Sequence, residues 1–167
     1  MESNTTGEAN VAVGYRTLDA NTTANFNTGV GYGTLGSNTT ASNNVAIGQQ
    51  ALCSNTTGSN NTALGSNAAV QLVTGNNNLI LGNSSGSQIA NNSNLTSLSN
   101  SVLMGSGTRI SANGGTNEIV IGYNAVGNGS HTIQLGNTSI TNVKTSGTIT
   151  AGAITIPNTD GTANQVL

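Results

Sequence analysis

The sequence predicts an all-β protein in which the chain winds as a parallel β-solenoid, and two observations carry that prediction. One polar phrase recurs every 17 residues, as "NTTGEANVAVG", "NTTANFNTGVG", "NTTASNNVAIG" and "NTTGSNNTALG". Asn, Thr, Ser and Gly together make up more than half of the 167 residues, while only 5% of the residues are charged. This composition favours short strands and many turns rather than disorder, which usually brings charge and proline.

A glycine ends each short apolar run and fixes the length of each repeat. The intervals between successive glycines are 17, 17, 17, 17, 23, 17 and 14 residues, for Gly14, Gly31, Gly48, Gly65, Gly82, Gly105, Gly122 and Gly136. An asparagine precedes each of the first five by four positions, at Asn10, Asn27, Asn44, Asn61 and Asn78. We therefore expect about eight coils of 14–17 residues over residues 1–136.

Each coil is expected to contain two strands joined by corners. The first strand is the apolar run, such as "VAIG" or "LILG", which is too short for a helix. The second strand is expected to pass through Leu18, Leu35, Leu52 and Ala69. The "NTT" phrase and the glycine form the corners. Stacked coils rise by about 4.8 Å each, so equivalent Asn and Thr side chains should form ladders along the solenoid.

Alternation along the first strand places its residues on two faces. We expect Val45 and Ile47, with their counterparts in other coils, to close the core of their own coil. Ala46, on the other face, is then expected to lie against a second chain. On this assignment, Ala46→Arg would damage assembly far more than Thr40→Arg. Two or three apolar side chains per coil make a thin core, which oligomerisation commonly reinforces.

Two segments depart from the regular repeat. The 23-residue interval contains an insertion near residues 83–100, expected to be a surface loop that is either a tolerated bulge or a lateral contact point. After Gly136 the period gives way to "SITNVKTSGTITAGAITI", which predicts an extended neck over residues 137–167. Because the first "NTT" begins at residue 4, we expect the chain to be a segment of a longer array.

The sequence offers no candidate catalytic, cofactor-binding or metal-binding residues. The acids Glu2, Glu8, Asp19, Glu118 and Asp160 are scattered and suggest no carboxylate pair. His131 is the single histidine, for which a structural or surface role is expected, and Cys53 is the single cysteine, expected to be a small, at least half-buried apolar residue. A trimer axis could bring three copies of one residue together, so an ion bound on that axis stays an open alternative. We predict a protein that is not an enzyme and needs no cofactor.

Three further patterns have ordinary explanations. The spaced glycines of "GYGTLG" around Gly31 lack a following helix and are interpreted as a corner of the repeat. The N-x-[ST] triplets at Asn4, Asn21, Asn38 and Asn55 are glycan-acceptor motifs, but this composition produces such triplets by itself. A formal charge of −2 without a basic stripe argues against nucleic-acid binding, and no apolar run is long enough for a membrane helix.

The stretch "NNVAIGQQAL" resembles the head repeats of trimeric autotransporter adhesins, whose consensus is close to N-x-V-A-I-G. That resemblance implies a left-handed parallel β-roll with three chains around one axis. The usual unit there is about fourteen residues, which only the interval from Gly122 to Gly136 matches here. The 17-residue "NTT" unit looks more like repeats in the tail-fibre proteins of phages and related viral fibres.

The C-terminal stretch "HTIQLGNTSITNVKTSGTITAGAITIPNTDGTANQVL" is similar to the segment that leads, in such fibres, into a self-cleaving intramolecular chaperone domain. The resemblance implies a homotrimeric structural and adhesive segment of a virion tail fibre, with a host-surface receptor or glycan as partner and no membrane insertion. The alternative is the head of a bacterial trimeric adhesin at the cell surface. An ice-binding solenoid, with the Thr pairs at 22–23, 39–40 and 56–57 as its face, is less favoured because Leu72 and Val73 interrupt the ladder.

Overall fold

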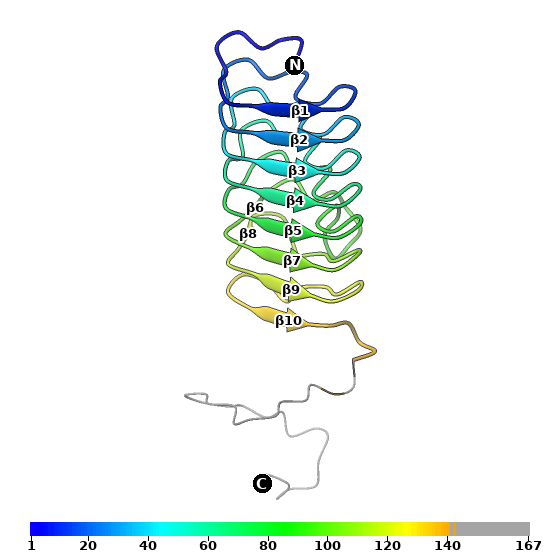
Figure 1. The fold of residues 1–167 in the computed structure, drawn as a ribbon. Coiled ribbons are helices and arrows are strands. Elements are labelled where there is room, and N and C mark those ends of the chain that lie inside the picture. Colours follow the sequence, from blue (N-terminus) through cyan, green and yellow to red (C-terminus); the bar gives the residue numbers. More distant parts are fainter. Residues whose placement is uncertain (141, 143–167) are drawn as a thin grey trace, which may run out of the picture.

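A computed structural model describes residues 1–140 and 142 of the chain, and these form a parallel β-solenoid without helices. Eight short strands stack into one parallel sheet in the order β1-β2-β3-β4-β5-β7-β9-β10, and a second, two-stranded sheet pairs β6 with β8 (Figure 1). The strands are β1 Val11–Val13, β2 Thr28–Val30, β3 Val45–Ile47, β4 Thr62–Leu64, β5 Leu79–Leu81, β6 Leu98–Ser99, β7 Val102–Met104, β8 Gly115–Thr116, β9 Ile119–Ile121 and β10 Ile133–Leu135.

The register of the large sheet confirms the coil lengths expected from the glycine spacing. Val45 pairs with Thr62, which lies 17 residues further on. The longer step joins Leu79 to Val102, and the 14-residue step joins Ile119 to Ile133. All neighbouring strands are parallel, so each coil returns the chain to the same place one inter-strand spacing along the axis.

The close approach of successive coils explains the repeated glycine. Gly48 has φ +129°, and a Cβ built on it would lie 2.5 Å from the backbone oxygen of Gly65. The same contact recurs at each equivalent glycine from Gly14 to Gly105. Any side chain there would both strain the backbone and push two coils apart.

The expected second strand through Leu18, Leu35, Leu52 and Ala69 is not present. These residues adopt left-handed turns, with φ between +50° and +52°. The coils still pair there, since Leu18 N donates to Thr34 O at 3.0 Å and Leu35 N to Ala51 O at 3.1 Å. A left-handed residue bends the chain, which ends any extended strand at this position. Because every coil bends at the same place, the backbone hydrogen bonds between coils are kept.

The expected faces of the first strand are inverted in the structure. Ala46 is fully buried in the core of its own coil, whereas Val45 and Ile47 are 37% and 40% exposed. Ile80, Leu103 and Val120 occupy the same buried position in later coils. The prediction that Ala46 faces a neighbouring chain is therefore wrong, and Ala46→Arg would disrupt the interior of its own coil.

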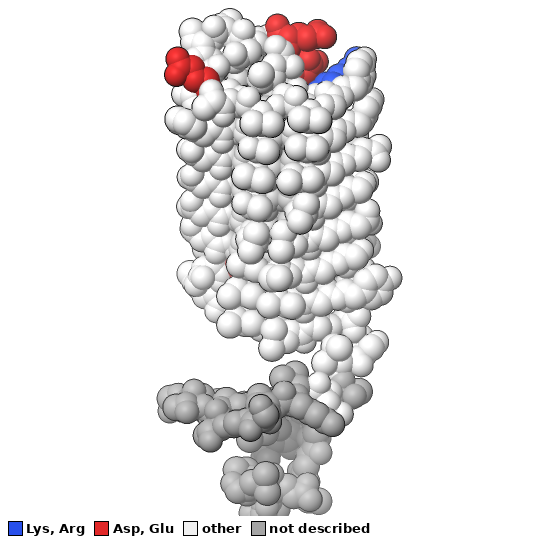
Figure 2. Space-filling view, viewed as in Figure 1, with Lys and Arg blue, Asp and Glu red and all other residues white. Residues whose placement is uncertain are grey.

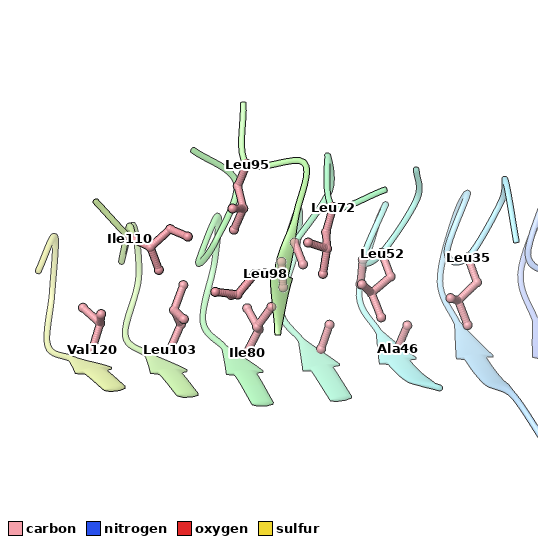
Figure 3. Packing of buried hydrophobic residues seen from close by; sticks show 14 of the residues in the cluster. Leu35, Ala46, Leu52, Leu72, Ile80, Leu95, Leu98, Leu103, Ile110 and Val120 are labelled. Atoms are coloured by element: carbon pink, nitrogen blue, oxygen red, sulfur yellow. The ribbon is translucent and has the colours of Figure 1, made fainter. Parts of the chain in front are cut away.

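The core is filled by side chains of complementary size (Figure 3). Leu52 points across the coil toward Ala46. A Cβ on Gly29 would lie 3.8 Å from Leu18 Cγ, so a turn leucine also reaches the strand position of the following coil. In the fifth coil the sizes are exchanged, because Ile80 occupies the strand position and Gly86 the turn position. A Cβ on Gly86 would lie 3.4 Å from Ile80 Cγ2 and 3.2 Å from Leu103 Cδ2.

Two ladders of buried asparagines cross-link the coils, as the repeat predicted. In one ladder, Asn44 Nδ2 donates to Gly58 O at 2.9 Å and to Asn27 Oδ1 at 3.2 Å, while its Oδ1 accepts from Asn61 N at 2.9 Å. In the other, Asn38 Nδ2 donates to Asn21 Oδ1 at 3.3 Å and to Ala41 O at 2.9 Å. Each side chain satisfies a corner carbonyl that would otherwise be buried without a partner.

The insertion near residues 83–100 contributes to the core rather than forming only a loop. It buries Ile89, Leu95 and Leu98, which pack with Ile110. β6, at its end, pairs with β8, and Ile89 bridges to Ile110. Most of the expected neck at 137–167 lies outside the described residues.

Candidate interaction surface

The outer face of the large sheet carries a continuous apolar surface. Its two columns of side chains run from β1 to β10, and every position is exposed or half-buried. Only Thr28 and Thr62 among the sixteen positions are not apolar. The first column contains residues 11, 28, 45, 62, 79, 102, 119 and 133, and the second contains residues 13, 30, 47, 64, 81, 104, 121 and 135.

We call these two columns the apolar face. In Figure 2 they run down the middle of the molecule, with no charged side chain along their length. Val11 and Val13 are 50% and 56% exposed in the first strand, and Ile133 and Leu135 are 64% and 49% exposed in the last. Contiguous apolar surface of this extent marks an interaction site in soluble proteins.

Charged residues gather around the N-terminal end of the solenoid (Figure 2). Glu2, Glu8, Arg16 and Asp19 all belong to the first coil. Between Asp19 and Arg109 the sequence contains no charged residue at all. The body of the solenoid therefore interacts through apolar and neutral polar groups.

All four aromatic residues of the chain are exposed, which sequence reasoning did not single out. Tyr15 and Tyr32 stand one coil apart and stack, with ring centroids 5.7 Å apart and planes inclined by 26°. Arg16 Cζ lies 5.4 Å from the centroid of the Tyr15 ring. The signal that identifies this pair in the sequence is the 17-residue spacing of the two tyrosines.

The structure does not gather the scattered acids into one site. Glu118 takes the place of an asparagine in the ladder and is completely buried; its Oε1 accepts from Gly129 N at 3.2 Å, and its Oε2 has no partner. A Cβ at Gly127 would collide with the carboxylate, so glycine at this position leaves room for it. Asp160 lies outside the described residues.

His131 and Cys53 lie in different coils of the solenoid. His131 is exposed, with its Nδ1 3.2 Å from Asn117 Nδ2, as a surface role predicts. Cys53 is half-buried, and this burial raises the pKa of its thiol, while a backbone hydrogen bond from Gly36 acts in the opposite direction. Within residues 1–140 and 142, no three His, Cys, Asp or Glu residues are grouped closely enough to hold a metal ion.

The polar motifs of the repeat are used inside the fold. The side-chain amides of Asn21, Asn38 and Asn55 are buried and donate to the corner carbonyls of Ala24, Ala41 and Gly58, so the folded chain does not present these three as glycan acceptors. Asn4, in the first coil, is exposed. Thr22 and Thr39 donate their hydroxyls to the next coil, which leaves a single exposed rank at Thr6, Thr23, Thr40 and Thr57. Turns follow Gly31, and no helix begins at "GYGTLG".

Compared with known protein families, with curated proteins and with solved structures, the chain shows no significant match. The described part of the chain also contains no helix that could cross a lipid bilayer. The apolar face and the exposed aromatic residues are therefore the features on which a function can be argued.

Proposed function

We propose that this chain is a structural and adhesive segment of a homotrimeric viral or phage tail fibre that contributes to attachment at the host surface. The observation that carries the proposal is the apolar face, which extends over all eight strands of the large sheet. The resemblance of the repeat to fibre and adhesin head repeats supports the same assembly. No chemical step is assigned to the segment, which acts by spacing and by binding.

The partner that best fits the apolar face is another copy of this chain. The two columns follow the coil spacing through 17-, 23- and 14-residue steps, so a matching surface must be equally long and have the same rise. A second copy of the same chain meets both conditions. Covering the face removes isoleucine, leucine and valine side chains from water, at about 25 cal/mol per Å² of apolar area.

Two columns per chain favour three chains over two. In a closed ring of three, each chain can offer one column to each of its neighbours, and the axis runs parallel to the solenoids. The assembly then acquires a shared apolar centre that compensates for the thin core of each chain. This arrangement agrees with the threefold β-roll that the resemblance implies.

Sedimentation velocity tests the proposal directly. The parent chain should sediment as a trimer of 16.5 kDa subunits. Ile47→Asp should abolish the trimer, because it brings three carboxylates into the apolar contact. Thr40→Asp is the matched control, since Thr40 is exposed in a corner away from the apolar face, and it should remain trimeric. A folded monomeric parent would contradict the proposal.

The head of a bacterial surface adhesin would share this geometry and remains the alternative. The adjoining sequence separates the two, because a self-cleaving chaperone domain identifies a fibre, whereas a coiled-coil stalk with a membrane anchor identifies an adhesin. Ice binding is less favoured, because Thr22, Thr39 and Thr56 donate their hydroxyls to backbone carbonyls of the next coil. A thermal-hysteresis measurement on the parent chain would test that function.

A further inference from the structure

Tyr15 and Tyr32 form an exposed aromatic platform at the N-terminal end of the solenoid. The Tyr15 and Tyr32 rings are 66% and 48% exposed. The chain has only four aromatic residues, and it leaves these two at the surface although tyrosine packs well in protein cores. Stacking holds the two rings in a fixed relation, 5.7 Å between centroids, and Arg16 lies against Tyr15. The platform is thus open to a ligand.

A shallow notch of about 280 Å³ adjoins the platform, with Tyr32 as one wall. Its floor is the second coil, where Gly33 and Gly36 stand at positions that carry Arg16 and Asp19 in the first coil and Gln50 and Cys53 in the third. The missing side chains of one coil therefore open a gap between the side chains of its two neighbours.

The backbone does not require glycine at position 33. Gly33 has φ +63°, and the equivalent residues Arg16, Gln50 and Asn67 adopt φ +57°, +56° and +57° with full side chains. A Cβ on Gly33 would meet only Gln50 Cγ, at an ordinary 3.6 Å. This differs from Gly48, where the fold itself excludes a side chain. The glycine at position 33 has the effect of keeping the notch open.

The side chains around the notch are mostly polar, and their formal charges sum to zero. Arg16 and Asp19 contribute opposite charges, and Gln50 contributes an amide, which together offer hydrogen-bond donors and acceptors. None of these three side chains makes a hydrogen bond or ion pair to another group within residues 1–140. Their hydrogen-bonding capacity is available to a ligand.

We propose that the platform and notch bind a neutral carbohydrate. The apolar C–H face of a pyranose ring can pack on Tyr32, while its hydroxyls meet the Arg16, Asp19 and Gln50 groups. Asp19 offsets the positive charge of Arg16, which argues against an acidic sugar or a phosphate. The inference deepens the adhesive part of the proposed function and depends on it.

The notch lies outside the residues that make the contact in the proposed trimer. It lies on the turn that follows each strand, whereas the apolar face consists of the strand residues themselves. A trimer therefore presents three equivalent notches around its N-terminal end. A shallow site binds weakly by itself, and three linked sites bind a dense glycan surface far more tightly.

The test is binding of the purified chain to an array of immobilised neutral and sialylated oligosaccharides. The parent should bind neutral structures. Tyr32→Ala should weaken that binding by about tenfold or more, because it removes the stacking surface. Gly33→Gln, which places the side chain of Gln50 in the notch, should do the same. Tyr123→Ala is the matched control, since Tyr123 occupies the same repeat position, is 68% exposed and has no stacking partner.

Cys53 gives a second readout in solution, because it is the single thiol of the chain and lines the notch. A bound neutral oligosaccharide should slow its alkylation in the parent and leave the rate unchanged in Tyr32→Ala. Burial raises the pKa of this thiol, so the assay is run at alkaline pH, where the reactive thiolate forms.

The outcomes separate this inference from the proposed function. A trimeric parent that binds no neutral oligosaccharide would overturn the inference and leave the fibre proposal intact, as would binding only to sialylated structures. Binding that survives both Tyr32→Ala and Gly33→Gln would also overturn it. A monomeric parent that binds through Tyr32 would support the notch and contradict the trimer.

Discussion

Leu18, Leu35 and Leu52 adopt a left-handed backbone conformation that large side chains rarely occupy. This conformation costs about 1–2 kcal/mol per residue. Full burial of a leucine returns about 1.5–3 kcal/mol, and all three side chains are completely buried. The burial term is the larger of the two, which explains why the coils accept a strained residue at the position that points into the core.

At the residue scale, the glycine that ends each strand should be the least tolerant position of the repeat. Gly48→Ala should destabilise the protein by about 3 kcal/mol or more, from backbone strain together with the contact to Gly65. Thermal unfolding followed by circular dichroism measures the effect.

Gly33→Asn is the control for Gly48→Ala, because Asn67 already occupies the equivalent left-handed position. It should change the stability by about 0.5 kcal/mol or less. Equal melting temperatures for the two variants would show that coil stacking does not depend on the glycine column.

At the scale of the coil, the interior is filled by exchange of volume between the strand and the turn. Ala46 lies opposite Leu52, whereas Ile80 in the fifth coil occurs with Gly86. These two coils thus place the larger side chain on opposite sides of the interior. Dense packing explains why neither position can change alone without cost.

A double-mutant cycle tests this exchange. Leu52→Ala should cost about 2–5 kcal/mol, because it leaves a cavity in the coil. Alanine is compatible with the backbone there, since Ala69 has φ +51° at the equivalent position. Adding Ala46→Leu should recover more than about 1 kcal/mol of that loss, although Ala46→Leu alone should be destabilising.

Thermal unfolding of the parent, both single variants and the double variant provides the four corners of the cycle. Strictly additive effects would mean that the two side chains do not share one cavity, contrary to their arrangement in Figure 3. Leu18 offers a control outside the pair, because it lies two coils from Ala46 and Leu18→Ala should not be rescued by Ala46→Leu.

The sequence specifies the coil but leaves the two faces of the strand ambiguous. The spacing of Gly48 and Gly65 predicts the register correctly, since backbone contact between coils admits only glycine. Alternation around Ala46 shows only that Val45 and Ile47 share a face. An apolar residue can fill a core or a chain interface equally well, so the burial of Ala46 could not be read from hydrophobicity.

A different signal in the sequence identifies the inner face. In the first three coils a leucine follows the glycine by four residues and the strand residue is Ala12, Gly29 or Ala46, whereas Gly86 follows Gly82 by four and the strand residue is Ile80. The fourth coil, with Ala63 and Ala69, does not share this exchange. Such compensation indicates two side chains that share one cavity. The left-handed turn at Leu52 carried no comparable signal, because leucine is an unusual residue at positive φ.

At the scale of the whole molecule, the apolar face determines how copies can associate. Its strands all run in one direction, and equivalent positions differ between coils, from Val13 in β1 to Met104 in β7 and Ile121 in β9. A parallel, in-register trimer places identical residues at the same height. An antiparallel association would instead bring the first coil of one chain near the last coil of its neighbour.

Single cysteines at the two ends of the apolar face distinguish these arrangements. Val13 and Ile121 lie in one column, six coil steps apart, which corresponds to about 29 Å. Val13→Cys and Ile121→Cys are made separately in a Cys53→Ser background, mixed while unfolded, refolded together and treated with a short bifunctional thiol reagent. Mass spectrometry should find 13–13 and 121–121 cross-links between chains, because only identical heights meet in a parallel trimer.

Thr40→Cys, placed in an exposed corner outside the apolar face, should give little cross-linking in the same background. A predominance of 13–121 products would show that the chains associate in antiparallel orientation. The apolar face would then join copies in an arrangement unlike that of a fibre.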